Sequence, residues 1–208
     1  MSNSVIYNEV ATTDKLIAIT FDDGPHPEWT PILLDLFREH GAHGTFFVIG
    51  SNLERHPGLA KRIHEEGHEL GNHTYSHPNL AEVDREKQRE ELSSTDRLIL
   101  DATGSSPKTF RPPYLSVNDD LLATASEFGY PIIHAANLDS RDWDAEVSAE
   151  HILTTSRAQV REGSILIYHD GFGDRSPTVA ALTTLIPELI AQGYRLVTVS
   201  ELLRARSR

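Results

Sequence analysis

A repeated alternation of short apolar runs with helical segments constrains the fold of this chain more than any other feature of its sequence. Runs rich in β-branched and aromatic residues predict strands at residues 16–19, 44–49, 69–72, 109–110, 131–136, 164–168 and 194–199. Amphipathic stretches predict helices at residues 30–40, 57–66, 84–101, 118–128, 148–161 and 176–192. Thr30-Pro31 and Ser176-Pro177 predict an N-cap followed by a proline at the first helical position. Strands alternating with helices imply a parallel sheet covered by helices.

The predicted sheet could close in two ways. An open doubly wound sheet would carry a glycine-rich nucleotide-binding loop after its first strand, but this chain has Asp22-Asp23-Gly24-Pro25 there. About seven β-α units therefore favour an α/β barrel with one unit fewer than the usual eight. Because the chain has 208 residues, we expect residues 1–208 to form a single domain.

The balance of charges narrows the range of partners. The formal net charge is −12 and the pI is about 5.3, so no nucleic-acid or membrane partner is expected, and a neutral substrate fits better. The absence of cysteine excludes a disulfide, a thiolate ligand and a cysteine nucleophile. The first residues lack the basic and apolar blocks of a signal peptide. We expect a secreted or cell-wall-associated protein whose leader lies outside this sequence, with a cytoplasmic protein as the alternative.

Ionisable and aromatic residues gather after five of the predicted strands. They are Asp22 and Asp23 after the first strand, His73 and His77 after the third, residues 111–114 after the fourth, residues 139–143 after the fifth, and His169 and Asp170 after the sixth. The carboxyl ends of parallel strands share one face of a barrel, and catalytic groups gather there. We therefore expect these side chains to form one site.

The adjacent carboxylates Asp22 and Asp23 indicate special chemistry at the end of the first strand. Like charges this close raise one another's pKa unless a cation or a donor neutralises one of them. The pair therefore suggests a metal, a general base, or both. The alternative is an ordinary turn, because Asp, Gly and Pro are common turn residues.

Two histidine pairs have i, i+4 spacing. His73 and His77 would point in the same direction on one helical turn, which suits two imidazoles on one metal. His64 and His68 match the H-E-x-x-H signature of zinc proteases, but that signature needs a continuous helix. Gly67 is expected to end the helix before His68, so we interpret this second pair as a helix end with solvated charges.

Catalytic zinc sites commonly take three protein ligands, and this chain offers Asp23, His73 and His77. Asp22 is then free to take a proton from a water molecule whose pKa the cation lowers. His169 is positioned to be the opposing acid, with a hydrogen-bonded core histidine as the alternative. Either Asp142 or Asp170 could hold His169 protonated, because a neighbouring carboxylate raises a histidine pKa.

With these residues in place, the chain resembles the polysaccharide deacetylases of carbohydrate esterase family four, the NodB homology domain. The resemblance covers a core of about residues 15–203 and no chemical position departs from the family pattern. It rests on five short motifs in order, which are residues 20–24, 73–77, 111–114, 139–143 and 166–170. The family fold is a distorted barrel, so the resemblance implies a distorted (β/α)7 barrel in a single domain.

The resemblance also implies a role for each motif residue. Asp22 would be the catalytic base, held by Arg111, and His169 would be the acid, paired with Asp142. A divalent metal, zinc first with cobalt, nickel or manganese as alternatives, would be bound by Asp23, His73 and His77. The backbone N–H of Tyr114 would help to stabilise the oxyanion. Substrate would be bound by Leu166, Trp143 and Tyr114, the first two receiving the acetyl methyl group.

The implied activity is metal-dependent hydrolysis of N-acetyl groups on a β-1,4-linked N-acetylglucosamine polymer. We expect a monomer that acts on chitin or chito-oligosaccharides rather than on peptidoglycan or acetylated xylan, because chitin is uncharged and the chain is acidic. Trp29, Tyr75 and Phe172 are candidates for stacking on sugar rings, and core packing is their alternative. From other classes, an amidase for small cyclic amides and a non-catalytic carbohydrate-binding barrel are the alternatives.

Overall fold

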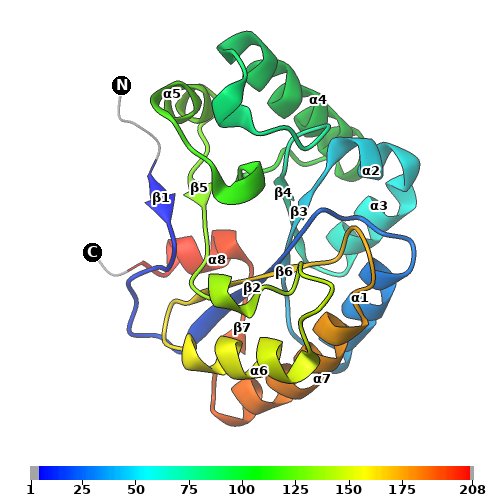
Figure 1. Ribbon diagram of the computed structural model, residues 1–208, viewed down its shortest axis with the longest axis vertical. Coiled ribbons are helices and arrows are strands. Elements are labelled where there is room, and N and C mark those ends of the chain that lie inside the picture. Colours follow the sequence, from blue (N-terminus) through cyan, green and yellow to red (C-terminus); the bar gives the residue numbers. More distant parts are fainter. Residues whose placement is uncertain (1–4, 207–208) are drawn as a thin grey trace.

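The central strand of the sheet carries the first two site residues at its carboxyl end. The computed structural model describes residues 5–206, and its longest strand is β2, Leu16–Asp22, all of whose residues are buried. Strand β2 pairs in parallel with β3, Thr45–Val48, on one side and with β6, Ile165–His169, on the other (Figure 1). Strand β4, Glu69–Asn72, continues the sheet beyond β3. Parallel pairing brings the carboxyl ends of these strands to one face.

Shorter elements close the sheet into a distorted α/β barrel, as predicted. Strand β5, Ile132–Ile133, pairs in parallel with β1, Ile6–Tyr7. Phe110 joins this pair to the main sheet through parallel bridges to Asn72 and Ile132. Strand β7, Arg195–Leu196, pairs with the first residues of β2 instead of extending the ring. The barrel is therefore regular along β4-β3-β2-β6 and irregular on the side of Phe110.

Three strands are much shorter than the sequence predicted, and one was not predicted. The strand predicted at residues 109–110 is reduced to the bridging residue Phe110, because Pro112 and Pro113 follow closely and proline offers no N–H to a ladder. The strands predicted at residues 131–136 and 194–199 shrink to β5 and β7, of two residues each. Strand β1 was not predicted. The sequence therefore predicted the number of β-α units better than the bounds of the individual strands.

Helices surround the strands on the outside. In residues 5–206 they are α1 Trp29–Glu39, α2 Gly50–Arg55, α3 Pro57–Glu65, α4 Arg85–Thr103, α5 Asp119–Glu127, α6 Ala149–Ala158, α7 Ser176–Ala191 and α8 Val199–Arg204. Figure 1 shows α4 and α5 on one side of the strands, α6 and α7 on the opposite side, and α1 to α3 between them. Helices α2 and α8 were not predicted from the sequence. None of the helices described is both long and apolar enough to cross a membrane.

Both predicted proline-linked N-caps are wrong by one or two positions. Helix α1 begins at Trp29, so Thr30 is helical, and its hydroxyl accepts the His26 N–H at 2.8 Å and donates to Asp170. Helix α7 begins at Ser176 itself, with Arg175 as the preceding residue. In the first case the hydroxyl is used in a tertiary contact behind the site, which outweighs local capping.

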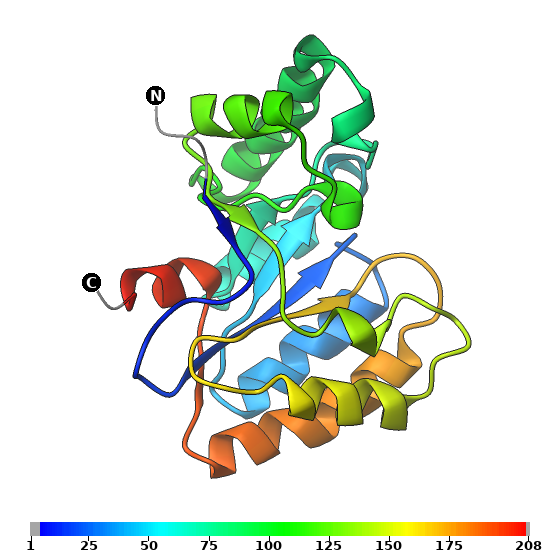
Figure 2. The ribbon, with the colours of Figure 1, turned by 60° about the vertical axis from the view of Figure 1, so that its left-hand side comes forward.

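The alternation of side chains along β2 and β6 separates two buried clusters. Outside the barrel, Phe21, Leu166 and Tyr168 pack against the surrounding helices. Inside it, Ala18 and Ile165 join a cluster that includes residues of α8, which lies at the amino ends of the strands (Figure 2). Each fully buried aliphatic or phenyl side chain stabilises the fold by about 1.5–3 kcal/mol. This register directs Asp22 and His169 to the interior of the barrel, because they share the faces of Ala18 and Ile165.

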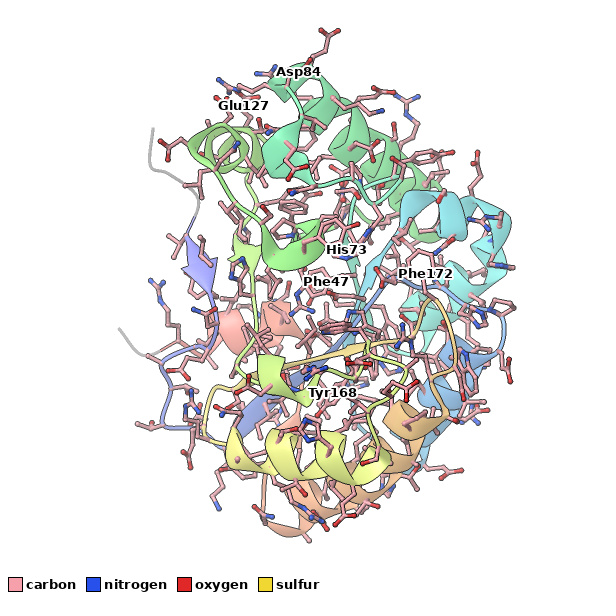
Figure 3. All side chains as sticks on the ribbon, viewed as in Figure 1. Phe47, His73, Asp84, Glu127, Tyr168 and Phe172 are labelled. Carbon is pink, nitrogen blue, oxygen red and sulfur yellow. The ribbon has the colours of Figure 1, made fainter. Side chains whose placement is uncertain are left out.

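The 3₁₀ turns of the chain lie in its loops, and they are η1 Leu80–Glu82, η2 Pro113–Leu115 and η3 Leu138–Ser140. Turns η2 and η3 follow Phe110 and β5, so both leave the carboxyl end of the barrel. Figure 3 labels Phe47 among the strands and Tyr168 on the side of α6, where its hydroxyl donates to Ser156 at 2.8 Å. Residues of the two turns therefore border the site described next.

Candidate metal centre and active site

Three predicted ligands meet at the carboxyl end of the barrel. The Oδ1 atom of Asp23 lies 3.2 Å from Nε2 of His77 and 3.5 Å from Nε2 of His73. One ligand atom from each residue falls within 4.8 Å of the others. Asp23 Oδ1 is buried and has no hydrogen-bond partner within residues 5–206. A carboxylate oxygen with two imidazole nitrogens around an unsatisfied centre fits a divalent cation.

The protonation of the ligands also fits a cation. Burial alone would raise the pKa of Asp23, but the imidazoles of His73 and His77 hold it well below its usual range, so the carboxylate is ionised. The Nδ1 atom of His73 lies 2.6 Å from the Arg111 carbonyl oxygen, and it donates its hydrogen there. This hydrogen bond leaves the lone pair of Nε2 for a metal, as second-shell partners of histidine ligands commonly do. His73 lies near the centre of the molecule in Figure 3.

The backbone around Asp23 is tightly constrained. Asp23 has φ of 72°, in the left-handed region, which turns the chain sharply after β2. A Cβ atom at Gly171 would lie 2.0 Å from the Asp23 carbonyl oxygen, so only glycine permits the loop after β6 to approach this turn. The close approach places residues that follow β6 directly beside the aspartate pair.

The two histidines do not meet through a helical turn, and this part of the prediction is wrong. Residues 73–77 form a loop in which Thr74 and His77 have φ of 69° and 61°. The His77 N–H donates to the Thr74 hydroxyl at 3.0 Å, and the Thr74 N–H donates to Asn72 at 2.7 Å. Side-chain acceptors satisfy the loop backbone in place of helical hydrogen bonds. The pair still converges, because the loop folds back on itself.

Asp22 is held by a buried guanidinium. Arg111 Nη1 donates to Asp22 Oδ1 at 2.7 Å and to the Thr20 hydroxyl at 2.8 Å. Two backbone carbonyls, those of Ile133 and His134, accept its other donors at 3.0 Å each. The Arg111 side chain is fully buried, so its orientation is fixed. The Oδ2 atom of Asp22 lies 3.9 Å from His73 Nε2, which leaves this oxygen beside the ligand set.

His169 is paired with Asp142 and not with Asp170. Its Nδ1 atom lies 2.7 Å from Asp142 Oδ1, and its backbone N–H donates to Asp142 Oδ2 at 2.8 Å. Burial would lower the pKa of His169, but Asp142, with smaller contributions from Asp22 and Asp23, outweighs it and raises the pKa to about 9. The Asp170 carboxylate accepts from Thr30 instead. Of the two candidates left open by the sequence, Asp142 is therefore the residue that holds His169 protonated.

A cavity of about 540 Å³ opens over these groups. It is lined by Asp22, Asp23, His73, His77, Pro112, Tyr114, Leu115, Leu138, Ser140, Arg141, Asp142, Trp143, Ile167 and His169. Tyr114 and Trp143 are 69% and 59% exposed, so large aromatic faces stand open at the rim. Pro112 and Pro113 have no amide hydrogen, and Tyr114 supplies the next N–H of this segment, at φ of 60°. These features suit a ligand with apolar faces and a polar group that reaches the carboxylates.

Leu166, predicted to bind the acetyl methyl group, does not line this cavity. Its side chain is fully buried in the outer cluster with Tyr168, whereas Ile167 borders the cavity with His169. Residues 167 and 169 share a face of β6, and residue 166 points to the opposite face. The apolar residue of β6 that borders the cavity is therefore one position later, and strand alternation counted back from His169 would have identified it.

The remaining sequence candidates have different outcomes. Phe172 is 55% exposed and its ring lies 6.2 Å from that of His77, although Phe172 does not line the cavity. Trp29 and Tyr75 do not border the cavity, and they donate to Gly173 and Glu54. The prediction that His68 lies beyond the end of its helix is confirmed, but the interpretation of His68 as a solvated charge is wrong, because its side chain is buried. Helix α3 ends at Glu65, and the buried His68 ring accepts from the Gly44 N–H at 3.0 Å.

Three supporting residues were missed from the sequence. The Thr20 hydroxyl accepts a hydrogen bond from Arg111. Arg175 donates to the backbone carbonyls of Gly171 and Asp142, at 2.9 Å each. Glu91, on α4, accepts from the loop of residues 73–77. Thr20 belongs to the first motif and could have been found by strand alternation from Asp22. Arg175 and Glu91 lie outside all motifs, and no local signal marks them.

An α/β barrel with an Asp-His-His cluster, a separate carboxylate and a carboxylate-paired imidazole belongs to the class of barrel hydrolases. Within that class the chain belongs to the polysaccharide deacetylase family, because residues 9–133 match the family model described as polysaccharide deacetylase. The predicted family, carbohydrate esterase family four with its NodB homology domain, and the predicted hydrolase class are confirmed.

Individual relatives extend the match over nearly the whole chain. A peptidoglycan-N-acetylglucosamine deacetylase of Bacillus cereus is 44% identical over 197 residues, which cover 94% of this chain and 92% of the relative. A chitooligosaccharide deacetylase of a Bradyrhizobium species is 35% identical, with 94% of each chain covered. The crystal structure of the Bc1960 peptidoglycan N-acetylglucosamine deacetylase matches this chain with a TM-score of 0.92 and 35% identity, and the match covers 99% of this chain and 94% of that one.

Proposed function

We propose that this chain, acting as one catalytic domain, hydrolyses N-acetyl groups of N-acetylglucosamine residues in a polysaccharide with the help of a divalent metal. One observation carries the proposal. A free carboxylate oxygen of Asp22 and a protonated imidazole of His169 border the same cavity as the Asp23, His73 and His77 cluster. A base, an acid and a metal-binding set in one cavity are what amide hydrolysis requires.

The residues of the chain would divide the reaction as follows. A bound divalent cation would lower the pKa of a water molecule and polarise the acetyl carbonyl. Asp22, oriented by Arg111, would accept the proton of the attacking water through Oδ2. His169, with a pKa of about 9, would donate its proton to the departing amine, which leaves poorly as an anion. The N–H of Tyr114 would help to stabilise the oxyanion, and Ile167 and Trp143 would contact the acetyl methyl group.

The metal would be held by Asp23, His73 and His77, and zinc is the first choice. Two imidazoles and a carboxylate also accept cobalt, nickel or manganese, because these ligands suit several first-row metals. Three protein ligands leave positions open for water and substrate, as catalytic sites need. A monomer would suffice, because all of the proposed groups come from one chain.

Peptidoglycan is the substrate that the relatives favour. The relative named a peptidoglycan deacetylase is 44% identical, against 35% for the one named a chitooligosaccharide deacetylase. The net charge of −12 argues in the other direction, because an acidic protein gains nothing from an anionic wall polymer. Chito-oligosaccharides therefore stay the second candidate. A peptidoglycan substrate would place the site of action at the cell wall.

The test is acetate release by the purified chain from peptidoglycan, chitopentaose, acetylated xylan and a small cyclic amide. Asp22→Asn and His169→Ala should each lower the rate roughly 100-fold or more, as expected for a general base or acid. His64→Ala, far from the cavity lining, is the matched control. A chelator should abolish activity and added Zn²⁺ restore it. Wild-type rates in either variant, or turnover of the cyclic amide alone, would refute the proposal.

A further inference from the structure

The carboxylate of Glu91 is buried, although Glu91 is not one of the proposed catalytic or metal-binding residues. Glu91 lies on α4, outside all of the family motifs, and its side chain is only 1% exposed. Burying an ionised carboxylate costs several kcal/mol unless hydrogen bonds and a counter-charge compensate for the loss of water. A solvent-facing position on the same helix would avoid that cost. The contacts of Glu91 therefore indicate what its burial achieves.

The Glu91 carboxylate accepts hydrogen bonds from the loop between His73 and His77, and it also contacts Lys87. Oε2 accepts the N–H groups of Tyr75 at 2.9 Å and Ser76 at 2.7 Å. Oε1 accepts the Ser76 hydroxyl at 2.7 Å and lies 3.1 Å from Nζ of Lys87. Burial would raise the pKa of Glu91, but these donors lower it below its ordinary value. The group is thus an ionised acceptor aimed at consecutive amides of one loop.

This loop has a conformation that its sequence does not favour. Tyr75 and Ser76 stand between His73 and His77, and both Thr74 and His77 have positive φ. Such conformations cost of order 1–3 kcal/mol for a residue with a side chain, and they persist only where surrounding contacts over-determine them. Glu91 accepts three charge-assisted hydrogen bonds at the middle of the loop, two from backbone N–H groups and one from a hydroxyl, and charge-assisted bonds are the stronger kind.

We propose that Glu91 is a positioning residue that shapes the 73–77 loop for metal binding and thereby sets the metal affinity of the site. The inference rests on the proposed metal centre and goes beyond it, because Glu91 touches neither the ligands' coordinating atoms nor the cavity. Without its carboxylate, the loop loses three of the contacts that offset its strain, and His77 Nε2 moves from its place 3.2 Å from Asp23 Oδ1. The site then binds a cation with two ligands in place of three.

The chain offers a matched control one residue away. Glu90 also contacts Lys87 Nζ at 3.1 Å, but its side chain is 65% exposed and it makes no contact with the loop. The experiment compares Glu91→Ala, Glu91→Gln and Glu90→Gln in metal-free protein. One measurement is the dissociation constant for Zn²⁺ from competition with a chromophoric chelator. The other is hydrogen exchange at the His77 amide, which donates to Thr74 and not to Glu91.

Loss of an outer partner typically weakens a metal site 10–100-fold, and we expect about that loss of Zn²⁺ affinity in Glu91→Ala. Glu91→Gln keeps the acceptor and loses the charge, so it should fall between Glu91→Ala and wild type. Glu90→Gln should stay within about twofold of wild type. The His77 amide should exchange faster in Glu91→Ala, and at the wild-type rate in Glu90→Gln.

The outcomes separate this inference from the proposed function. Wild-type Zn²⁺ affinity and wild-type His77 exchange in a folded Glu91→Ala would overturn the role of Glu91. Should Glu91→Ala not fold, Glu91→Gln decides, and an unchanged dissociation constant in it would overturn the role equally. A wild-type chain that binds no Zn²⁺ would overturn both the proposed metal centre and the role of Glu91 in metal affinity. Normal metal binding without acetate release would defeat the proposed function alone.

Discussion

His169 and Asp142 are joined by two contacts, one from the ring and one from the backbone of the same histidine. Nδ1 lies 2.7 Å from Oδ1, and the backbone N–H donates to Oδ2 at 2.8 Å. The double contact fixes both the position of the strand end and the orientation of the ring. It also keeps Nδ1 occupied, so Nε2 is the nitrogen available to the cavity. Thr178, which donates to Asp142 Oδ2 at 3.1 Å, fixes the carboxylate in turn.

Replacing Asp142 should move the alkaline limb of the pH profile. Asp142 contributes most to the rise in the pKa of His169 to about 9, so Asp142→Asn should lower that pKa toward 6.5. An acid works only below its pKa. We therefore expect the alkaline limb of kcat/KM for acetate release to move about two pH units or more toward acid. Asp139→Asn, at an exposed position outside the cavity, is the control, and an unmoved limb in Asp142→Asn would contradict the assignment.

Removing the guanidinium of Arg111 should destabilise the fold as well as the site. Arg111→Met leaves Asp22 as a buried charge without its cation, and two carbonyls lose their donors. Breaking a buried pair in this way costs about 3–5 kcal/mol of unfolding free energy, measurable by urea denaturation. Arg89→Met breaks an exposed pair with Glu127 and should cost less than about 1 kcal/mol. Equal losses in the two variants would show that burial of the Arg111 pair does not matter.

Neighbouring residues of β6 should give opposite phenotypes. Leu166→Ala creates a void in the outer cluster and should cost about 2–5 kcal/mol of unfolding free energy, with kcat/KM within about twofold of wild type. Ile167→Ala enlarges the cavity where the acetyl methyl group is proposed to lie. It should lower kcat/KM about tenfold, as a lost apolar contact does, and destabilise the fold less than Leu166→Ala. Denaturation and acetate-release kinetics on the same preparations check both halves, and a reversed pattern would restore Leu166 as the pocket residue.

The sequence predicted the alternation of strands and helices, and with it the face on which the site lies. Patterns of this kind are local, because a buried strand such as β2 is apolar whatever surrounds it. The Asp23, His73 and His77 cluster followed from that placement, since parallel strands end on one face. The prediction of the individual short strands was weaker, because two-residue strands such as β5 and β7 depend on neighbours and not on their own residues.

Tertiary contacts account for what the sequence did not reveal. Thr30 looked like an N-cap, but its hydroxyl is used by Asp170, 140 residues away along the chain. His73 and His77 have helical spacing, yet Glu91 and Asn72 hold the residues between them in a loop. The residues next to Thr30 and within the 73–77 loop do not indicate which distant residues they contact. The chemistry of a motif could therefore be predicted, while the contacts that shape the motif could not.

Because of Asp170, the stability of the metal-free protein should fall as pH rises from 4 to 7, the opposite of the usual effect of a carboxyl group. Burial raises its pKa from 3.8 to about 7, and its Oδ1 atom has no hydrogen-bond partner within residues 5–206. Between these pH values the folded chain holds a proton that the unfolded chain has lost, so unfolding free energy falls as pH rises. Asp170→Asn cannot titrate. Its stability relative to wild type should therefore improve from pH 4 to 7, by on the order of 3 kcal/mol, and then level off.

Urea denaturation with a chelator present, at pH values on both sides of 7, measures this difference. Asp174→Asn is the matched control, because hydrogen bonds from the Ser176 N–H and hydroxyl lower the pKa of the exposed Asp174. A lowered carboxyl pKa stabilises the fold above the unfolded value and loses that effect as pH falls, so the control should show a small change of opposite sign. Parallel pH curves for wild type and Asp170→Asn would mean that Asp170 is ionised in the fold at neutral pH. A rising difference would instead establish a neutral carboxyl group behind the two aspartates, which adds no further negative charge to the site.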